Sequence, residues 1–237
     1  MAGWRDAAIA GVLGAVVGAG AVTLAERATG HDEAAIGRIV HDYVLAHPEI
    51  LPEALHRLQD QQTAKLVAVH RTAIEQPFGG AWAGAANGDV TLVEFTDFAC
   101  GYCRASLADV NRLLADDPKL KVVYREIPIL SPDSAAAAKV ALAAATPERY
   151  GVYRRSLYAA GPLTSQTIAA AAAAAGIDPG AGNGAAIAHE IDDNLALAKT
   201  LGLAGTPSFI IGDQVLSGAV GYRALKDAVD AAREKRG

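Results

Sequence analysis

Cys100 and Cys103 lie three positions apart in the stretch FACGYCRAS and are the only cysteines among the 237 residues. Two thiols at this spacing can form a redox-active pair, supply half of a metal site, or be small buried side chains. A structural zinc site takes about four ligands, and the sequence has neither a second Cys-x-x-Cys nor a histidine near this one. The redox pair is therefore favoured, while a soft-metal (copper) carrier that uses both thiolates stays open as the alternative.

The residues around the pair predict how the two thiols differ. Residues 90–95 are almost continuously apolar, which is typical of a buried strand, and a helix is predicted from Cys100 or Gly101 to Leu114. At the start of a helix the unpaired N–H groups favour a thiolate. We therefore expect Cys100 to be an exposed nucleophile, with Cys103 one turn further in as the resolving thiol.

Two further candidate active-site residues, Thr206 and Pro207, lie far along the chain. They directly precede an apolar run that is predicted to be a strand. Proline is tolerated at the first position of a strand, and a cis bond there would turn the chain towards the sulfurs. A trans proline that simply opens the strand is the alternative.

Glu94 interrupts the apolar run six residues before Cys100. A buried carboxylate is costly and is usually paired or functional. Glu94 is therefore a candidate to accept the proton of Cys103, unless it lies on a strand edge in solvent.

The order of the predicted elements indicates an α/β fold. A second strand at 120–127 completes a β-α-β unit, and the alanine-rich residues 131–202 are predicted to form a helical insert. Strands at 207–212 and 214–218 and a closing helix at 222–235 follow. The main domain is expected to span residues 88–237.

Residues 31–76 are predicted to form a helical arm, joined to the main domain by a glycine-rich linker at 77–87. The arm carries a narrow apolar stripe that needs a partner, and self-association is favoured over packing against the main domain. Its histidines are never three or four positions apart, so a metal site on one helical face is not indicated.

The first 30 residues are predicted to be a signal peptide or a membrane anchor. Residues 7–25 form an uncharged run of 19 residues, which as a helix spans about 28 Å, close to the thickness of a bilayer core. An uncleaved anchor is favoured over a cleaved signal peptide or a buried soluble helix.

The formal net charge of −5 argues against nucleic acid as a partner, because phosphate binding needs clustered Lys and Arg.

The combination of FACGYC, a long helical insert and GTPSFIIG resembles the DsbA-type thioredoxin-fold thiol–disulfide oxidoreductases of the bacterial cell envelope. The resemblance implies a redox-active disulfide Cys100–Cys103 with no other cofactor. It also implies a cis proline at Pro207, with Thr206 before it, and a buried acid at Glu94.

The arm, with IVHDYVLAHPEILPEAL, resembles the N-terminal extension of the copper-sensitivity (ScsC-like) and outer-membrane Com1-like branch. In that branch the extension can mediate oligomerisation, and some members are disulfide isomerases. The dipeptide between the cysteines is Gly101-Tyr102, not the Pro-His of strong oxidases, so a less extreme redox potential is expected. The dipeptide favours an isomerase, with an oxidase as the alternative.

The resemblance also implies partners and a location. The expected substrates are cysteine-containing secreted proteins, and a membrane redox partner would restore the active site. The expected location is the periplasm, with residues 7–25 as a tether to the inner membrane. A membrane-tethered scaffold whose cysteines are incidental is a third interpretation.

Overall fold

The computed structural model describes residues 33–235. The chain divides into two compact units, residues 1–58 and residues 59–237. The first contains a helix over residues 33–46 and the first turns of α2 (Ile50–Glu75). Pro48 lies in the turn between the two helices, and Pro52 lies in the first turn of α2. Proline is tolerated there because the first N–H groups of a helix have no intrahelical acceptor.

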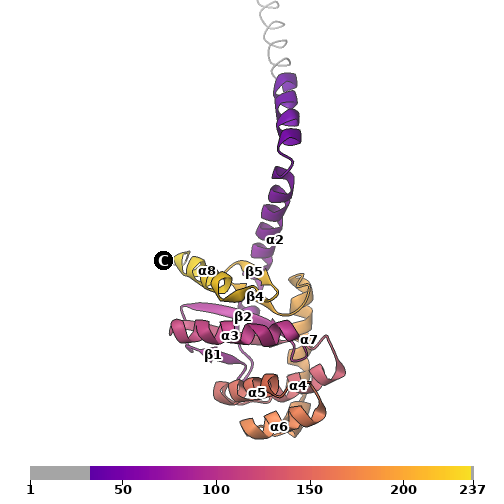
Figure 1. The fold of residues 1–237 in the computed structure, drawn as a ribbon, viewed down its shortest axis with the longest axis vertical. Helices are drawn as coiled ribbons and strands as arrows, with labels where there is room; N and C mark the ends of the chain where they lie inside the picture. The colour runs from indigo at the N-terminus through magenta and orange to yellow at the C-terminus, as the bar shows by residue number, and fades with distance from the viewer. Residues whose placement is uncertain (1–32, 236–237) are drawn as a thin grey trace, which may run out of the picture. The chain divides into compact units, whose positions relative to one another are not determined.

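The second unit is built on a five-stranded sheet with the order β1-β3-β2-β4-β5 (Figure 1). β2 and β3 are parallel, and the other neighbouring pairs are antiparallel. α3 (Gly101–Asp116) connects β2 to β3, which confirms the predicted β-α-β unit. The strands are β1 (Trp82–Gly84), β2 (Val90–Thr96), β3 (Leu120–Glu126), β4 (Ser208–Ile211) and β5 (Gln214–Ser217).

β1 lies inside the stretch that was predicted to be a linker at 77–87, and that prediction is corrected here. Trp82 pairs with Val123 in the antiparallel β1–β3 ladder. Three residues among glycines are too few to show an alternating pattern, so the strand forms because the edge of β3 is available to pair with it.

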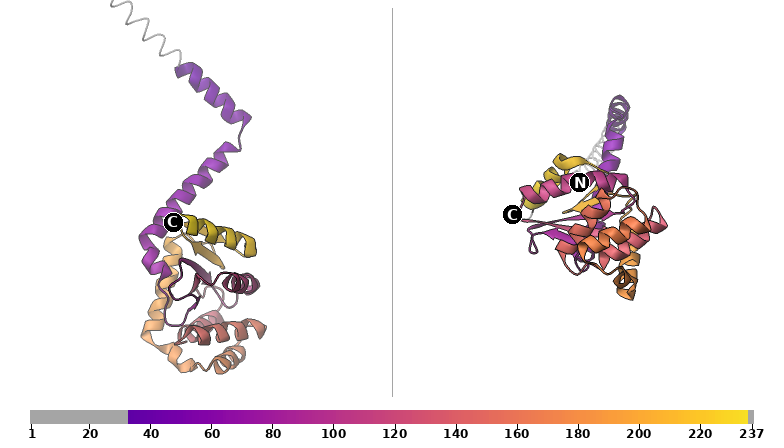
Figure 2. Two further views of the ribbon diagram at one scale, coloured as in Figure 1. Left: turned by 90° about the vertical axis from the view of Figure 1, so that its left-hand side faces the viewer. Right: turned by 60° about the horizontal axis from the view of Figure 1, so that its bottom comes forward.

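The predicted insert is helical, and α4, α5 and α6 lie together at one end of the domain (Figures 1 and 2). The side chains of Ser131, Thr146 and Thr164 each accept a backbone N–H at the start of α4, α5 and α6. The remaining elements are α4 (Pro132–Leu142), α5 (Pro147–Ala159), α6 (Ser165–Ala175), η1 (Pro179–Asn183), α7 (Ala185–Thr200) and α8 (Gly221–Glu234).

Each face of the sheet has its own apolar core. Leu92 and Val122 face one cluster, which includes residues of α3, α5 and α8. Val93 faces the other cluster, together with Val67 and Ile74 of α2. The second half of α2 therefore belongs to the main domain, which corrects the prediction that the whole of 31–76 is a separate arm.

Arg125 of β3 holds the C-terminal end of α2 on this second face. The last carbonyls of a helix have no intrahelical donor, so a buried guanidinium can satisfy several of them. Its donors reach Ile74 O at 3.2 Å, Gln76 O at 2.5 Å, Ala73 O, Glu190 Oε1 at 2.6 Å and Asn194 Oδ1 at 3.0 Å.

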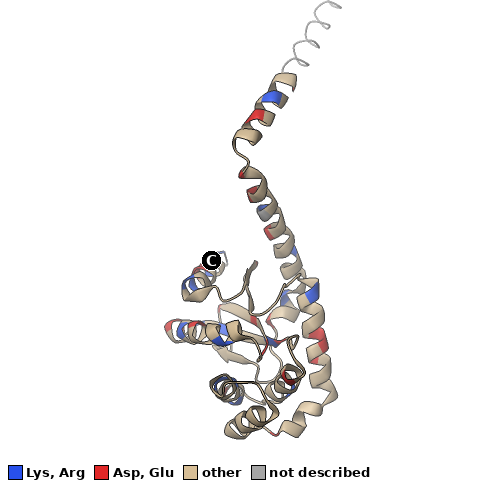
Figure 3. Cartoon of the chain, turned by 45° about the vertical axis from the view of Figure 1, so that its right-hand side comes forward, with Lys and Arg blue, Asp and Glu red and all other residues tan. Residues whose placement is uncertain are grey.

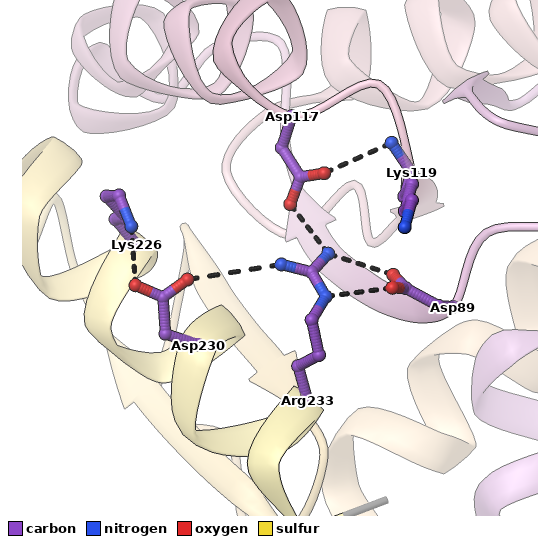
Figure 4. Close-up of polar contacts among 6 residues, drawn as sticks. All are labelled: Asp89, Asp117, Lys119, Lys226, Asp230 and Arg233. Atoms are coloured by element: carbon purple, nitrogen blue, oxygen red, sulfur yellow. Dashed lines mark hydrogen bonds and ion pairs between the residues drawn. The ribbon is translucent and has the colours of Figure 1, made fainter. Parts of the chain in front are cut away.

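Arg233 links the closing helix α8 to the segments that directly precede β2 and β3 (Figure 4). Its guanidinium donates to both carboxylate oxygens of Asp89 at 2.8 Å and to Asp117 at 2.7 Å. These hydrogen bonds raise the pKa of Arg233. Because the guanidinium is about one third exposed, solvent weakens these ion pairs.

Basic and acidic residues are mixed along the described part of the chain (Figure 3). Within residues 33–235 there is no helix long and apolar enough to span a bilayer. Residues 1–30, the predicted signal peptide or anchor, lie outside the described residues, so that interpretation stays a prediction.

Candidate active site

Cys100 is the N-cap residue of α3, as the sequence predicted. The backbone N–H of Cys103 donates to Cys100 Sγ at 3.3 Å, and the Cys100 thiol donates to the carbonyl oxygen of Thr206 at 3.2 Å. Both cysteines are free thiols. The sulfur therefore lies between the first turn of a helix and the segment that leads into β4.

The sheet explains why residues so far apart in sequence meet here. β2 and β4 are antiparallel neighbours, with Phe95 opposite Ser208, so the end of β2 lies beside the start of β4. The Thr206–Pro207 peptide bond is cis, which confirms that prediction.

The two thiols differ in environment, although not entirely as expected. Cys100 is only 6% exposed, so the prediction of an exposed nucleophile is wrong as regards the whole residue. The neighbouring Tyr102 is 70% exposed, and a Cβ added at Gly101 would meet nothing within 4 Å. The surface beside Cys100 is therefore open even though its own side chain is largely covered.

Cys103 is fully buried, and burial raises the pKa of its thiol to about 12. Hydrogen bonds with the Asp97 backbone and the Thr96 side chain act in the opposite direction, whereas Cys100 and the charge of Glu94 raise the pKa further. Cys103 is therefore protonated at neutral pH and needs a base before it can attack a disulfide.

Glu94 is fully buried beneath this site, so the alternative of a solvent-exposed strand edge is wrong. Both of its carboxylate oxygens accept from Nη2 of Arg154, at 2.7 and 2.9 Å. The Arg154 guanidinium also lies over the rings of Tyr124 and Tyr158, at 4.3 and 5.4 Å from their centroids. The buried acid thus has a buried cationic partner that comes from the helical insert.

Arg154 was not among the site residues predicted from the sequence. It stands in RYGVYRRSLY beside a second arginine, and nothing in that stretch alone says which arginine faces inwards. The available signal was helical spacing, because Tyr150, Arg154 and Tyr158 recur every four residues and share a face with the buried Leu157.

Asp97 was also missed, and it fixes the segment before Cys100. Its carboxylate accepts from the N–H groups of Ala99 at 2.8 Å, Ile129 at 2.9 Å and Leu130 at 3.0 Å. These hydrogen bonds join the active-site segment to the segment that follows β3. Ile129 and Leu130 are about half exposed, so apolar surface lies near the thiols.

The described residues offer no additional metal site, since no group of three or more His, Cys, Asp or Glu side chains is placed to hold an ion there. The side chains of His41 and His47 in the arm are exposed, and each lies beside a neighbouring acidic residue.

The fold and the cysteine pair define a thioredoxin-like thiol–disulfide oxidoreductase. Residues 91–230 match the model of the DSBA-like thioredoxin domain, and residues 32–65 match that of the copper resistance protein ScsC N-terminal domain. The chain therefore belongs to the DsbA-like thioredoxin family, and it carries the N-terminal domain found in ScsC.

Several solved structures are similar to this chain. The thiol–disulfide exchange protein alpha-DsbA2 from Wolbachia pipientis is 30% identical, with a TM-score of 0.67 over 73% of this chain and 97% of that one. A linker-deletion variant of Proteus mirabilis ScsC is 25% identical, with a TM-score of 0.70 over 86% and 95%. A periplasmic thioredoxin-like protein from Salmonella enterica serovar Typhimurium is 26% identical, with a TM-score of 0.62 over 70% and 97%. A comparison with curated protein sequences finds no match.

Proposed function

We propose that this protein forms or isomerises disulfide bonds in secreted proteins through the Cys100–Cys103 pair. The observation that carries the proposal is the asymmetry of the two thiols. Cys100 Sγ accepts an N–H at the start of α3, whereas Cys103 is fully buried with a raised pKa. Cys100 is therefore placed to form a mixed disulfide with a substrate, and Cys103 is placed to break that bond and release the substrate.

The reaction proceeds by two thiol–disulfide exchanges. In isomerisation the Cys100 thiolate attacks a substrate disulfide, which gives a mixed disulfide and releases one substrate thiolate. A thiolate of the same substrate then attacks the mixed disulfide, so that a new substrate disulfide forms and the Cys100 thiolate leaves. If Cys103 attacks Cys100 Sγ instead, the Cys100–Cys103 bond forms and the substrate leaves with both sulfurs reduced. Oxidation of a substrate runs this second route in reverse.

Two neighbouring groups have proposed roles. Glu94 accepts the proton of Cys103 when that thiol attacks, which its burial and its charge beneath the thiol support. Thr206 and Pro207 lie beside Cys100 and hold the substrate backbone next to the sulfurs, which is supported by the contact between Cys100 and the Thr206 carbonyl.

Within this proposal an isomerase is favoured over an oxidase because Gly101-Tyr102 supplies no histidine between the cysteines. A thiolate without that partner is less stabilised, so the disulfide form is a weaker oxidant.

The deciding experiment is the reduction potential of the Cys100–Cys103 pair, obtained by equilibration with glutathione. A value of about −200 mV or below fits an isomerase or a reductase, whereas a value near about −120 mV fits a strong oxidase and contradicts the argument from Gly101-Tyr102. The copper-carrier alternative predicts stoichiometric binding of Cu(I) without any exchange with glutathione.

The same proposal includes a location and an assembly. One similar protein is periplasmic, and the uncharged run at 7–25 supports an envelope location with a tether to the inner membrane. We propose that residues 31–76 mediate self-association, since Val40, Tyr43 and Leu55 are exposed in the arm.

A further inference from the structure

A second buried acid, Glu126, lies at the end of β3. β2 and β3 are paired so that Glu94 is opposite Tyr124 and Thr96 is opposite Glu126. Because side chains alternate along a strand, Glu126 lies on the same face of the sheet as Glu94 and Thr96. Glu126 is fully buried and has no part in the thiol chemistry described above.

The polar contacts of Glu126 are incomplete. The hydroxyl of Tyr150 donates to its Oε1 at 2.5 Å, whereas Oε2 has no hydrogen-bond partner among the described residues. Arg154 is similarly incomplete, because Nη2 binds Glu94 while Nε and Nη1 have no partner there. Two buried carboxyl groups therefore lie near one guanidinium.

The charges in this cluster indicate which of the two buried carboxyl groups, Glu94 or Glu126, carries a proton. One guanidinium neutralises one carboxylate, and a second ionised carboxyl group in the same dry environment is disfavoured. Arg154 contacts both oxygens of Glu94, so its positive charge is already matched by that carboxyl group. Burial raises the pKa of Glu126 to about 8, although the Tyr150 hydrogen bond and the charge of Arg154 act to lower it.

Several groups surround Glu126 and enter this balance. They are Tyr150, Tyr153 and Arg154 of α5, Glu94 of β2, Tyr124 of β3 and Asp97 before α3. Asn194 of α7 donates to the backbone carbonyl of Glu126. Arg154 is the one cation among them, which makes its pairing with Glu94 sensitive to the charge of Glu126.

We propose that Glu126 is a positioning residue of the active site, which stays protonated and thereby leaves Arg154 paired with Glu94 alone. The inference rests on the proposed function. If Glu126 ionised, it would attract the unpartnered Nε and Nη1 of Arg154 and add a second negative charge on the face of the sheet that carries Glu94. Both effects destabilise the negative charge on Glu94 and therefore favour the transfer of a proton from Cys103 to Glu94.

The affected step is the resolution of the mixed disulfide. Glu94 takes the proton of Cys103, and the resulting thiolate attacks Cys100 Sγ. The Cys100–substrate bond breaks, and the departing substrate thiolate takes the proton back from Glu94. Glu126 keeps its own proton throughout this step, so it takes no part in the proton transfer and affects the rate only by remaining uncharged.

The test compares the pH dependence of this step in the natural protein and in Glu126→Gln. Each reduced protein is mixed with excess oxidised glutathione and quenched in acid, and the mixed disulfide and the Cys100–Cys103 disulfide are quantified by intact mass. The amide imitates a permanently protonated acid. Ionisation of Glu126 above pH 8 can speed the resolving step only in the natural protein, so the ratio of the resolving rate of E126Q to that of the natural protein should fall about tenfold between pH 7 and pH 9.

Tyr150→Phe provides a second, independent variant. Removing the hydroxyl removes a hydrogen bond that lowers the pKa of Glu126. The alkaline gain in the resolving rate should therefore move to higher pH in Y150F, whereas a purely structural defect would lower the rate equally at every pH. Thermal unfolding of each variant shows that the folded protein is being compared.

The outcomes separate the inference from the proposed function. A rate ratio that stays constant from pH 7 to pH 9, together with an unshifted profile in Y150F, overturns the role of Glu126. A natural protein that forms no mixed disulfide and no Cys100–Cys103 disulfide at any pH overturns the proposed function itself.

Discussion

At the scale of single residues, the two sulfurs of the site differ mainly in the groups that surround them. Cys100 and Cys103 are one helical turn apart, and both are largely or fully covered. What distinguishes them is that Cys100 lies at the helix start beside the Thr206 carbonyl, whereas Cys103 lies on the side that faces Glu94. The different roles proposed for the two thiols therefore come from their surroundings, because the two side chains are chemically identical.

This asymmetry predicts the alkylation behaviour of Cys103. In Cys100→Ser, we expect native Cys103 to react with iodoacetamide very slowly up to about pH 10, because its thiol is buried and has a pKa of about 12. The same protein in urea should react readily near pH 9, with alkylation followed by mass. Fast native labelling at pH 8 would contradict the burial of Cys103.

The stability of the protein should reflect the same pKa. The folded pKa of Cys103 lies above its ordinary value of 9.0, so the unfolded chain loses this proton first as the pH rises. Stability from this group is complete below pH 9 and is lost as the pH rises from about 9 to about 12. Denaturant titrations at pH 8 and pH 10 should show a steeper loss in the natural protein than in Cys103→Ala.

Glu94 can be tested by trapping the intermediate. In Glu94→Gln the amide cannot accept the proton of Cys103, so the mixed disulfide with glutathione should persist at least tenfold longer. The variant also leaves Arg154 buried without an anion, so a loss of about 3–5 kcal/mol of stability is expected. Normal resolution by a folded E94Q protein would remove Glu94 from the mechanism.

At the scale of elements, the arm and the catalytic domain share one helix. Val67 and Ile74 of α2 pack against the sheet, and Arg125 binds the carbonyls at the end of α2. A helix end that is held by a buried guanidinium cannot detach without exposing several polar groups. We therefore expect the second half of α2 to unfold together with the catalytic domain.

Arg125 of β3, which binds the end of α2, and Arg71 within α2, which binds Asp213, allow a matched comparison. Arg125→Met should lose about 3–5 kcal/mol, because it leaves Glu190 and three helix-end carbonyls without their donor. Arg71→Met removes a half-buried contact with Asp213, and its cost should stay below about 1 kcal/mol. Urea unfolding gives both values, and equal losses would show that Arg125 is not the main attachment.

At the scale of the whole molecule, the arm and the catalytic domain each expose large apolar side chains. Large apolar side chains of the arm are exposed, among them Val40, Tyr43 and Leu55. In the catalytic domain the corresponding exposed residues include Tyr102, Ile129 and Leu130. Apolar surface of this kind is usually covered by a partner, which fits a domain that meets substrates and an arm that meets other copies of itself.

The arm can be tested by changing one face of α2. A chain of residues 31–237 should self-associate, and the double variant Leu55→Glu with Leu58→Glu should be monomeric by light scattering, because it places charge in the apolar stripe. Arg57→Glu changes the net charge equally on the opposite face and should keep the assembly. If all three proteins are monomeric at micromolar concentration, self-association through the arm is wrong.

The pattern along the chain was enough to predict the main features of the fold and of the reactive pair. The apolar run before Cys100, the alanine-rich insert and the strand after Pro207 are local signals, and each formed the predicted element. The three-residue β1 and the position of α2 left no such signal. Trp82–Gly84 is a strand because β3 has an open edge, and the second half of α2 is a core helix because Val67 and Ile74 meet the sheet.

The sequence by itself determined that two thiols stand at the start of a helix, with an acid on the preceding strand and a Thr-Pro pair far along the chain. Local spacing is sufficient for this, since helix and strand periods set which neighbours share a face. Only the tertiary structure decided that Glu94 pairs with Arg154, that Asp97 holds the active-site segment, and that Glu126 lies on the same face as Glu94. Those contacts join residues about 30 to 60 positions apart, and which groups meet across such separations depends on how the sheet and the insert pack.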